Sequence, residues 1–282
     1  MRFGFVTCVQ LGLSCMEEIY ARGGALALAI TLPDHKALAK SGRVHLDDFC
    51  AAKAIPLVKV ANVNDPEALA AIGAHGIDWL FIVGWSQIAR SGVLAAPRQG
   101  ALGIHPTLLP EGRGRAAIPW AILLGLEQTG VTLFQLDEGV DTGPILGQVA
   151  LPLSAQETAT SLYHRVARAH RELIAQVWSG LEAGRLQAVP QDPAAGSVWG
   201  GRTPEDGRIL PAMSALAADR LVRATTLPYP GAFQDLPEGR LRVWAGRPGL
   251  DGEPVPAHAR ELRLAQGRYF ATSWDLEPSP SS

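Results

Sequence analysis

One histidine and three carboxylates stand where two predicted strands of the chain end. His105 closes the apolar run 101–104 and precedes a stretch rich in proline, glycine and arginine, so we expect it at the carboxyl end of a strand. A second strand-like run leads into a turn that carries Asp137, Glu138 and Asp141. Open α/β sheets bind ligands at this edge. An imidazole beside a carboxylate there predicts an acid–base site.

The residues alone leave other interpretations open. A lone histidine at a strand end is often a structural hydrogen-bonding residue, and three acids in one loop often only solvate a turn. His164 and His170 lie on one predicted helix. They are six positions apart and therefore on different faces of it, which argues against a shared metal ion. We expect no metal site.

The elements that must position these residues alternate along the first half of the chain. Repeated strand–helix–strand units predict an α/β fold, with a parallel sheet covered by helices on both faces. The expected strands are 3–7, 25–31, 56–60, 79–83, 101–104 and 131–136, and the expected helices are 15–21, 46–53, 66–72 and 157–181.

The composition changes after the last of these helices. Residues 189–206 are rich in proline, glycine and small side chains, and short strand-like runs follow at 241–244, 261–264 and 269–273. We therefore expect two domains, 1–200 and 201–282, the second of them β-rich.

Bulk composition excludes several classes of protein. The chain has 282 residues, 47% of them hydrophobic and 18% charged, so it can bury a core. Its net charge of −2 supplies no general attraction for a polyanion. The three cysteines are unevenly spaced, which predicts reduced thiols and a cytoplasmic location. No stretch reaches the roughly 20 apolar residues of a membrane span.

Several short motifs, in order, resemble the 10-formyltetrahydrofolate-dependent formyltransferase family. They are Gly103-Ile-His-Pro-Thr-Leu-Leu-Pro, Arg113-Gly-Arg-Ala-Ala-Ile-Pro-Trp, Thr129-Gly-Val-Thr and Asp137-Glu-Gly-Val-Asp-Thr-Gly. The family pattern is Asn-x-His followed by Asp-x-Gly, and the spacing here (141 − 105 = 36) is the one the family uses. This chain has Gly103 where the family has Asn.

The resemblance implies a fold and a set of site residues. It implies a Rossmann-like, mostly parallel sheet followed by a small β-barrel-like C-terminal domain, because 202–208 and 222–233 are similar to the linker and opening of that domain. It makes His105 and Asp141 catalytic. The expected folate-binding residues are Gly84, Trp85, Ser86, Gln87, Ile88, Asp137, Glu138 and Gly139, and the expected acceptor-binding residues are Gly103, Thr107, Arg113, Arg115 and Gln10.

Some of these assignments have plain alternatives. Trp85 could anchor the core, as most tryptophans do, and the arginines of the 111–115 loop could serve solubility rather than bind a phosphate or carboxylate. The polar segment from Lys36 to Arg43, which contains Lys40, could close over the site or be an ordinary loop.

Gly103 cannot supply the side-chain donor that the family Asn offers to the oxygen of the transferred formyl group. We expect Gln87 to replace it, since its amide has the same N–H chemistry. Thr107, Arg113 and Arg115 are further candidates. Alternatively, Gly103 makes room for a bulky acceptor.

Three functions fit these observations. The first is formyl transfer from 10-formyltetrahydrofolate to a small amine, such as a nucleotide-linked aminosugar. The second is formylation of methionyl-tRNA. The charge of residues 201–282 disfavours it, because ten Arg and no Lys are balanced by ten Asp plus Glu, whereas a domain that binds RNA should be basic. The third is a folate-binding or hydrolytic relative that lost amine transfer. We expect no membrane and no nucleic acid among its partners, and a homodimer is one possible assembly.

Overall fold

The computed structural model describes residues 1–36 and 43–278 of the chain. Lys40 and most of the polar segment expected near the site therefore lie outside the described residues. The chain divides into two compact units, each built from three segments. The first unit comprises Met1–Gly114, Thr129–Leu151 and Arg165–Val198, and the second Arg115–Gln128, Pro152–His164 and Trp199–Ser282. The expected boundary near residue 200 stays a prediction.

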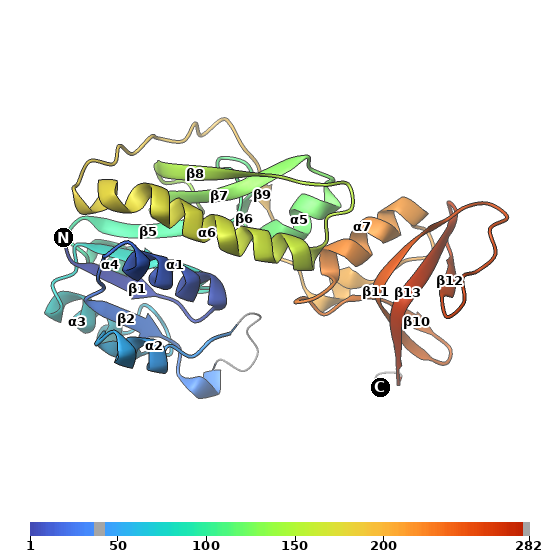
Figure 1. Cartoon of the computed structure of the whole chain (residues 1–282), viewed down its shortest axis with the longest axis horizontal. Coiled ribbons are helices and arrows are strands. Elements are labelled where there is room, and N and C mark those ends of the chain that lie inside the picture. The colour runs from blue at the N-terminus through green and yellow to red at the C-terminus, as the bar shows by residue number, and fades with distance from the viewer. Residues whose placement is uncertain (37–42, 279–282) are drawn as a thin grey trace. The chain divides into compact units, whose positions relative to one another are not determined.

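A seven-stranded sheet forms the centre of the first unit (Figure 1), in the order β3-β2-β1-β4-β5-β7-β8. The first five strands of this order pair in parallel, and β7 pairs antiparallel with β5. The strands are β1 Phe3–Val6, β2 Leu28–Thr31, β3 Leu57–Lys59, β4 Trp79–Ile82, β5 Gly100–His105, β7 Gln128–Gln135 and β8 Ile145–Pro152; the short strands β6 and β9 cover Arg113–Gly114 and Val198–Trp199.

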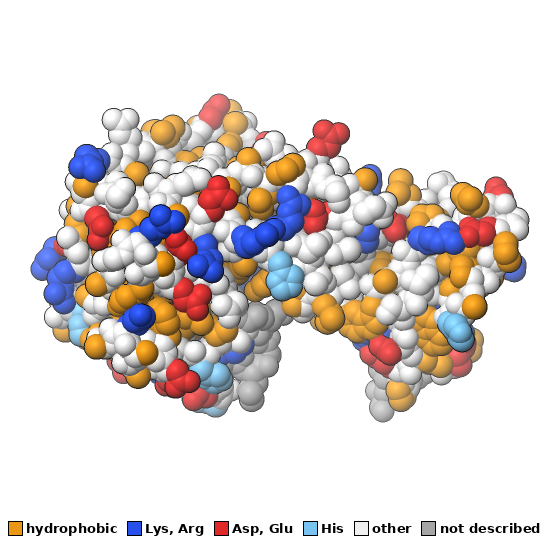
Figure 2. Space-filling view, in the orientation of Figure 1, with side chains coloured by type: hydrophobic (Ala, Val, Ile, Leu, Met, Phe, Trp, Pro, Cys, Tyr) orange, Lys and Arg blue, Asp and Glu red, His pale blue; other side chains and the backbone are white. Residues whose placement is uncertain are grey.

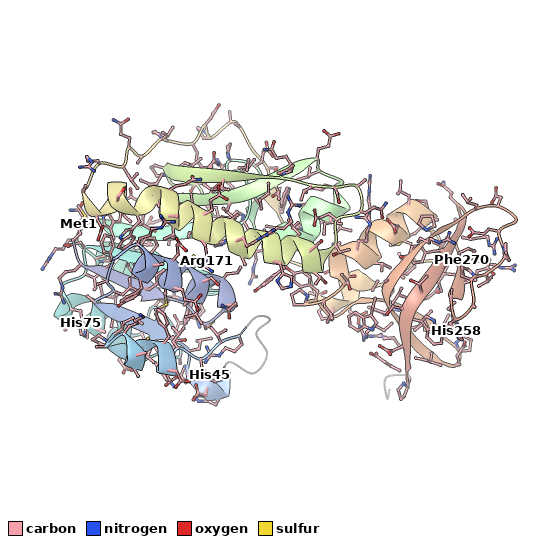
Figure 3. All side chains as sticks on the ribbon, viewed as in Figure 1. Met1, His45, His75, Arg171, His258 and Phe270 are labelled. Atoms are coloured by element: carbon pink, nitrogen blue, oxygen red, sulfur yellow. The ribbon has the colours of Figure 1, made fainter. Side chains whose placement is uncertain are left out.

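Helices connect these strands. The longest, α6, buries the apolar face expected from its spacing, because Leu162, Val166, Leu173 and Val177 are at most 5% exposed. Arg171 of the same helix, labelled in Figure 3, forms an ion pair with the buried carboxylate of Glu18 on α1. The helices are α1 Gln10–Ala21, α2 Asp47–Ala52, α3 Pro66–Ala74, α4 Ser91–Ala95, α5 Ala117–Leu123, α6 Ala159–Glu182 and α7 Ala215–Thr225, with 3₁₀ turns η1 Asp34–Lys36 and η2 Pro204–Gly207.

The second unit contains a curled antiparallel sheet of four strands, β10-β11-β13-β12. Helix α7 packs against β11 and buries Leu221 and Val222 over Leu241 and Val243. The register of β11 against β13 shifts between Val243 and Gly246, and such irregularities bend a strand. The strands are β10 Ala232–Leu236, β11 Gly239–Gly249, β12 Arg260–Arg263 and β13 Arg268–Glu277.

The expected fold class is confirmed: a Rossmann-like, mostly parallel sheet with helices, and a curled half-barrel sheet toward the C-terminus. Some elements differ from expectation. Helix α1 begins at Gln10, five residues before the expected start, and β2 begins at Leu28 rather than at Ala25. Strand β8 and the helices α4, α5 and α7 were not expected.

The three cysteines are free and buried. Burial raises the pKa of the Cys15 thiol and raises that of Cys50 to about 11. These thiols are therefore poor nucleophiles. Among the described residues, no helix has both the length and the apolar character needed to cross a lipid bilayer.

Candidate active site

His105 is the last residue of β5 and is held there by a backbone carbonyl. Its side chain is buried, and Nε2 lies 2.8 Å from the oxygen of Gly112. A carbonyl oxygen can only accept, so Nε2 carries a hydrogen and donates it. Nδ1 is therefore the ring nitrogen that can gain or lose a proton.

Asp141 faces that second nitrogen. It lies in the turn after β7, and its Oδ2 is 3.6 Å from Nδ1 of His105. This separation exceeds a normal hydrogen bond but is a close charge contact. The same oxygen accepts the backbone N–H of Gly114 at 2.8 Å. The structure thus brings together the two residues that sequence reasoning paired, each from the end of its own strand.

Gln191 joins the two loops that carry this pair. Its Nε2 donates to the carbonyl oxygens of Asp141 and Gly143, at 2.9 and 2.7 Å. Its Oε1 accepts from Nε and Nη2 of Arg113, at 3.1 and 2.8 Å. Gln191 was not identified as a site residue from the sequence. The one feature that could have indicated it is the presence of a single amide side chain between Pro190 and the next proline, in a stretch of small residues.

Ser197 fixes the loop that holds the imidazole. Its hydroxyl donates to a carboxylate oxygen of Glu111 at 2.7 Å and accepts the backbone N–H of Gly112 at 3.0 Å. The backbone N–H of Arg113 also donates to the carbonyl of Ser197, at 2.9 Å. Segment 191–197 therefore supports both the His105 and the Asp141 sides of the site.

Two family models match the chain, described as formyl transferase over residues 22–178 and as formyl transferase C-terminal domain over residues 202–265. The first match alone covers more than half of the sequence. The chain belongs to the formyl transferase family. The resemblance inferred from the His105 and Asp141 motifs is confirmed.

The chain is similar to proteins that are named for different acceptors. A methionyl-tRNA formyltransferase of Anaeromyxobacter sp. (strain K) is 31% identical over 277 residues, which cover 97% of this chain and 88% of the relative. The crystal structure of an N-formyltransferase from Helicobacter canadensis, with folinic acid and dTDP-3-aminofucose, has a TM-score of 0.69 at 14% identity and covers 96% of this chain and 98% of its own. A variant of HypX from Aquifex aeolicus has a TM-score of 0.69 at 19% identity; the match covers 97% of this chain but 44% of HypX. At these identities the solved structures show a shared fold.

Gly103 departs from the formyl transferase pattern, and the structure leaves no room for a side chain there. A Cβ atom at this position would lie 2.8 Å from Cδ2 of Leu136 and 3.0 Å from Cε1 of Phe134. Two apolar side chains thus fill the space where a family Asn would begin. This contradicts the alternative that Gly103 opens space for a bulky acceptor.

Gln87 does not supply the missing donor of the family pattern. Its Nε2 donates to the carbonyl of Ala61 at 2.9 Å, while its Oε1 accepts from the backbone of Val63 and the indole of Trp85. Ala61 and Val63 follow β3, which is separated from the His105 strand by β2, β1 and β4. The expectation that Gln87 replaces the Asn is therefore wrong, because its amide is held toward the β3 edge of the sheet and away from β5.

The loop after β4 carries the other expected folate-binding residues. Gly84 has a φ of +64°, and Ser86 and Ile88 are exposed, the latter by 79%. Trp85 is half-buried and packs against the core, so the anchoring interpretation holds for part of its ring. Folate binding by these residues stays a prediction.

The turn after β7 is organised by its first carboxylate. Asp137 accepts hydrogen bonds from the backbone of Gly139 and the hydroxyl of Thr142. Glu138 is exposed. Asp141 has a φ of +54°, a left-handed conformation that is uncommon for a residue other than glycine. Such strain is tolerated where surrounding bonds impose it.

The expected acceptor-binding residues occupy different environments. Arg113 is buried against Gln191, and Thr107 is buried with a hydroxyl that has no hydrogen-bond partner among the described residues. Arg115 is exposed and belongs to the second unit. Gln10 is exposed and donates to the hydroxyl of Ser14. Acceptor binding by these residues stays a prediction.

His170 of α6 is a buried histidine that interacts electrostatically with His105. Burial is the main cause that lowers the pKa of His170 to about 4. The bond between its Nδ1 and the carbonyl of Val166 opposes this shift, and the charge of His105 adds to it. His170 is therefore neutral at physiological pH.

One group among the described residues has the composition of a metal site. Asp34, His45 and Asp47 lie close together and are exposed; His45 is labelled in Figure 3. The ammonium of Lys59 lies 3.3 Å from Asp34 and 2.7 Å from Asp47. A cation from the protein itself therefore already pairs with both carboxylates.

Proposed function

We propose that this protein transfers the formyl group of 10-formyltetrahydrofolate to the amine of a small acceptor. The observation that carries the proposal is the facing pair of His105 Nδ1 and Asp141 Oδ2 at the carboxyl end of β5. Membership of the formyl transferase family supports the reaction type. The pair is suited to proton transfer, which amine formylation requires.

The described residues fit a folate donor. The loop 84–88 presents exposed backbone and the exposed side chain of Ile88 at the end of β4, beside the strand that ends at His105. A ring system could pack there, at the sheet edge where open α/β folds bind ligands. The bound donor supplies an electrophilic formyl carbon.

The acid–base pair would handle the proton that the attacking amine loses. Asp141 accepts it directly or through water, and Nδ1 of His105 can take it up because Nε2 remains committed to Gly112. A protonated Nδ1 then donates to the oxygen on which negative charge develops. In the family pattern an Asn at position 103 would also donate to this oxygen, but Gly103 has no side chain to do so.

The second unit favours a small acceptor over a nucleic acid, because most of its arginines are already paired. Eight of the ten arginines after residue 200 have a carboxylate partner within 4 Å: Arg208, Arg223, Arg240, Arg242, Arg247, Arg260, Arg263 and Arg268. Hydrogen bonds from Arg240 and Arg208 lower the pKa of Asp235, so that carboxylate stays charged. Paired arginines release few counterions from a phosphate backbone.

Some of these guanidinium groups also pack on aromatic rings. Arg268 and Arg247 lie 4.8 and 5.4 Å from the ring centre of Phe270, which is labelled in Figure 3. On the face shown in Figure 2, blue and red side chains of this unit lie next to one another. This arrangement stabilises the sheet itself and supports the proposal of a small acceptor, such as a nucleotide-linked aminosugar.

Methionyl-tRNA is the second candidate acceptor. It is favoured by the 31% identity to a methionyl-tRNA formyltransferase across nearly the whole chain. Purified protein and 10-formyltetrahydrofolate should be incubated with dTDP-3-aminofucose, with initiator methionyl-tRNA, or with neither, and products measured by mass spectrometry. We expect a formylated sugar. Formylated methionyl-tRNA alone would establish the second candidate, and equal tetrahydrofolate release without any acceptor would show a hydrolase.

A further inference from the structure

We infer that Gln191 is a positioning residue, one that holds the Asp141 carboxylate against His105. The inference rests on the proposed function, in which Asp141 takes the proton of the attacking amine. Four hydrogen bonds make the connection: two from the amide nitrogen to the carbonyls of Asp141 and Gly143, and two to the amide oxygen from Arg113.

These bonds use the full hydrogen-bonding capacity of an amide. Two N–H groups meet two carbonyl oxygens, and two lone pairs meet two guanidinium N–H groups. A carboxylate in place of Gln191 would keep the bonds to Arg113 but could donate nothing to Asp141 or Gly143. Position 191 therefore requires an amide rather than any polar side chain.

The bonds close a ring around the catalytic carboxylate. Arg113 is followed in the chain by Gly114, whose N–H donates to Oδ2 of Asp141, and Gln191 connects Arg113 back to the Asp141 backbone. The aspartate is thus held at its backbone from one side and at its carboxylate from the other. This fixes the direction in which Oδ2 points, toward Nδ1 of His105.

The Asp141 backbone needs support beyond the Asp137 bonds that organise the turn, because those bonds reach Gly139 and Thr142 but not Asp141 itself. Asp141 has a φ of +54°, and residues Glu138, Gly139 and Val140 before it are exposed. A left-handed conformation is strained for a residue other than glycine and persists only where its surroundings impose it. Without Gln191, we expect the turn to relax and the carboxylate to leave the imidazole.

Two substitutions separate positioning from a merely structural role. Gln191→Glu keeps the size of the side chain and can pair with Arg113, while Gln191→Ala removes every bond. Gln187→Ala is the matched control, since Gln187 lies four residues before Gln191 in the chain and is exposed. We expect both Gln191 variants to lose kcat by about a hundredfold, as displaced catalytic groups do, with KM for the folate donor little changed.

The melting temperatures of the two Gln191 variants should differ. Because Gln191→Glu regains a partner for Arg113, it should melt close to the parent although it is as inactive as Gln191→Ala. If Gln191 only stabilised the fold, Gln191→Glu would retain kcat. That result would overturn the inference.

A second readout does not depend on activity. The Gly114 amide reports the position of Oδ2, so its hydrogen exchange, followed by NMR, should be about tenfold faster in both Gln191 variants than in the parent and in Gln187→Ala, as expected when its acceptor moves away. Unchanged Gly114 exchange would refute the inference even if kcat fell. A parent protein that formylates no acceptor would refute the proposed function instead, while the Gly114 measurement would still test whether Gln191 places Asp141.

Discussion

Nδ1 of His105 faces Oδ2 of Asp141 at 3.6 Å, while Nε2 of the same ring is bound to the Gly112 carbonyl at 2.8 Å. The backbone bond fixes the hydrogen on Nε2 and leaves the lone pair of the neutral ring on Nδ1. In the proposed reaction, the proton that His105 exchanges would therefore lie on the side of the carboxylate, and the two residues would act as one acid–base unit.

Asp141→Asn should reduce turnover by about 10²- to 10⁴-fold, because the amide cannot accept a proton from the amine. The fold should be kept, since the Asn oxygen can still accept the Gly114 N–H. Steady-state kinetics and a melting curve check this. Turnover equal to the parent would exclude Asp141 from the chemistry.

His105→Ala should also abolish turnover. Unlike a loop residue, His105 is 8% exposed, so its loss also removes packing and the bond to Gly112. We therefore expect a fall in stability of about 1–3 kcal/mol, measured by urea denaturation. His105→Gln, which can still donate to Gly112, is the companion variant: it should recover stability but not activity.

Gly103→Asn should fail to restore a family-like site. Its Cβ would lie 2.8 Å from Leu136 and 3.0 Å from Phe134, and such overpacking costs roughly 1–3 kcal/mol. Gly73→Asn is the control, because nothing lies within 4 Å of that Cβ position. Higher turnover in Gly103→Asn with an unchanged melting temperature would contradict this prediction, and Gly103→Asn combined with Leu136→Ala should relieve part of the strain.

Gln87→Ala should lower stability rather than kcat. It removes an amide that bonds Ala61, Val63 and Trp85, and leaves buried groups unpaired at a cost of about 1–3 kcal/mol. Folate affinity should fall as the loop after β4 loosens. Gln99→Ala, at an exposed glutamine, serves as the control. A hundredfold loss of kcat with unchanged folate affinity would contradict this prediction and support Gln87 as the donor that replaces the family Asn.

Stability should fall in mild acid because of His170. Its folded pKa of about 4 lies below the ordinary value of 6.5, so the unfolded chain binds the proton more readily between these values. The contribution is therefore complete above pH 6.5 and is lost as the pH falls toward 4, by at most about 3 kcal/mol.

Denaturant unfolding from pH 4 to 7 measures this dependence. His170→Phe should flatten the curve, whereas His164→Phe, at an exposed position of the same helix, should leave the slope unchanged. A parent curve that is already flat across this range would contradict the assignment.

Strands buried on both faces were predictable from the sequence. β1, β4 and β5 are continuous apolar runs, and their observed bounds lie within one residue of those expected. β8 was missed because it is only half-buried and contains Gly147 and Gln148, so neither a continuous nor an alternating pattern marks it. Helix α5 was missed because it is short and contains Pro119.

The site residues also divide into those that the sequence predicts and those that it does not. His105 and Asp141 were predictable because each follows a strand and carries chemistry in its own side chain. Gln191 was not, because its partners at Asp141 and Gly143 are backbone carbonyls, which leave no trace in residue types. Gln87 was misassigned because the direction of its amide depends on where the 61–63 loop lies, and nothing near Gln87 in the sequence encodes that position.

Gly112 restrains the imidazole of His105 with a backbone carbonyl, an atom pair that every residue possesses, yet its φ of +69° suits few residues besides glycine. In a genetic selection for activity, position 112 would therefore tolerate as little change as His105 itself. A mutational map of this protein would mark Gly112 as essential although it has no side chain. Substitutions there would fail because they change the conformation of the main chain, and not because they remove a group that takes part in the chemistry.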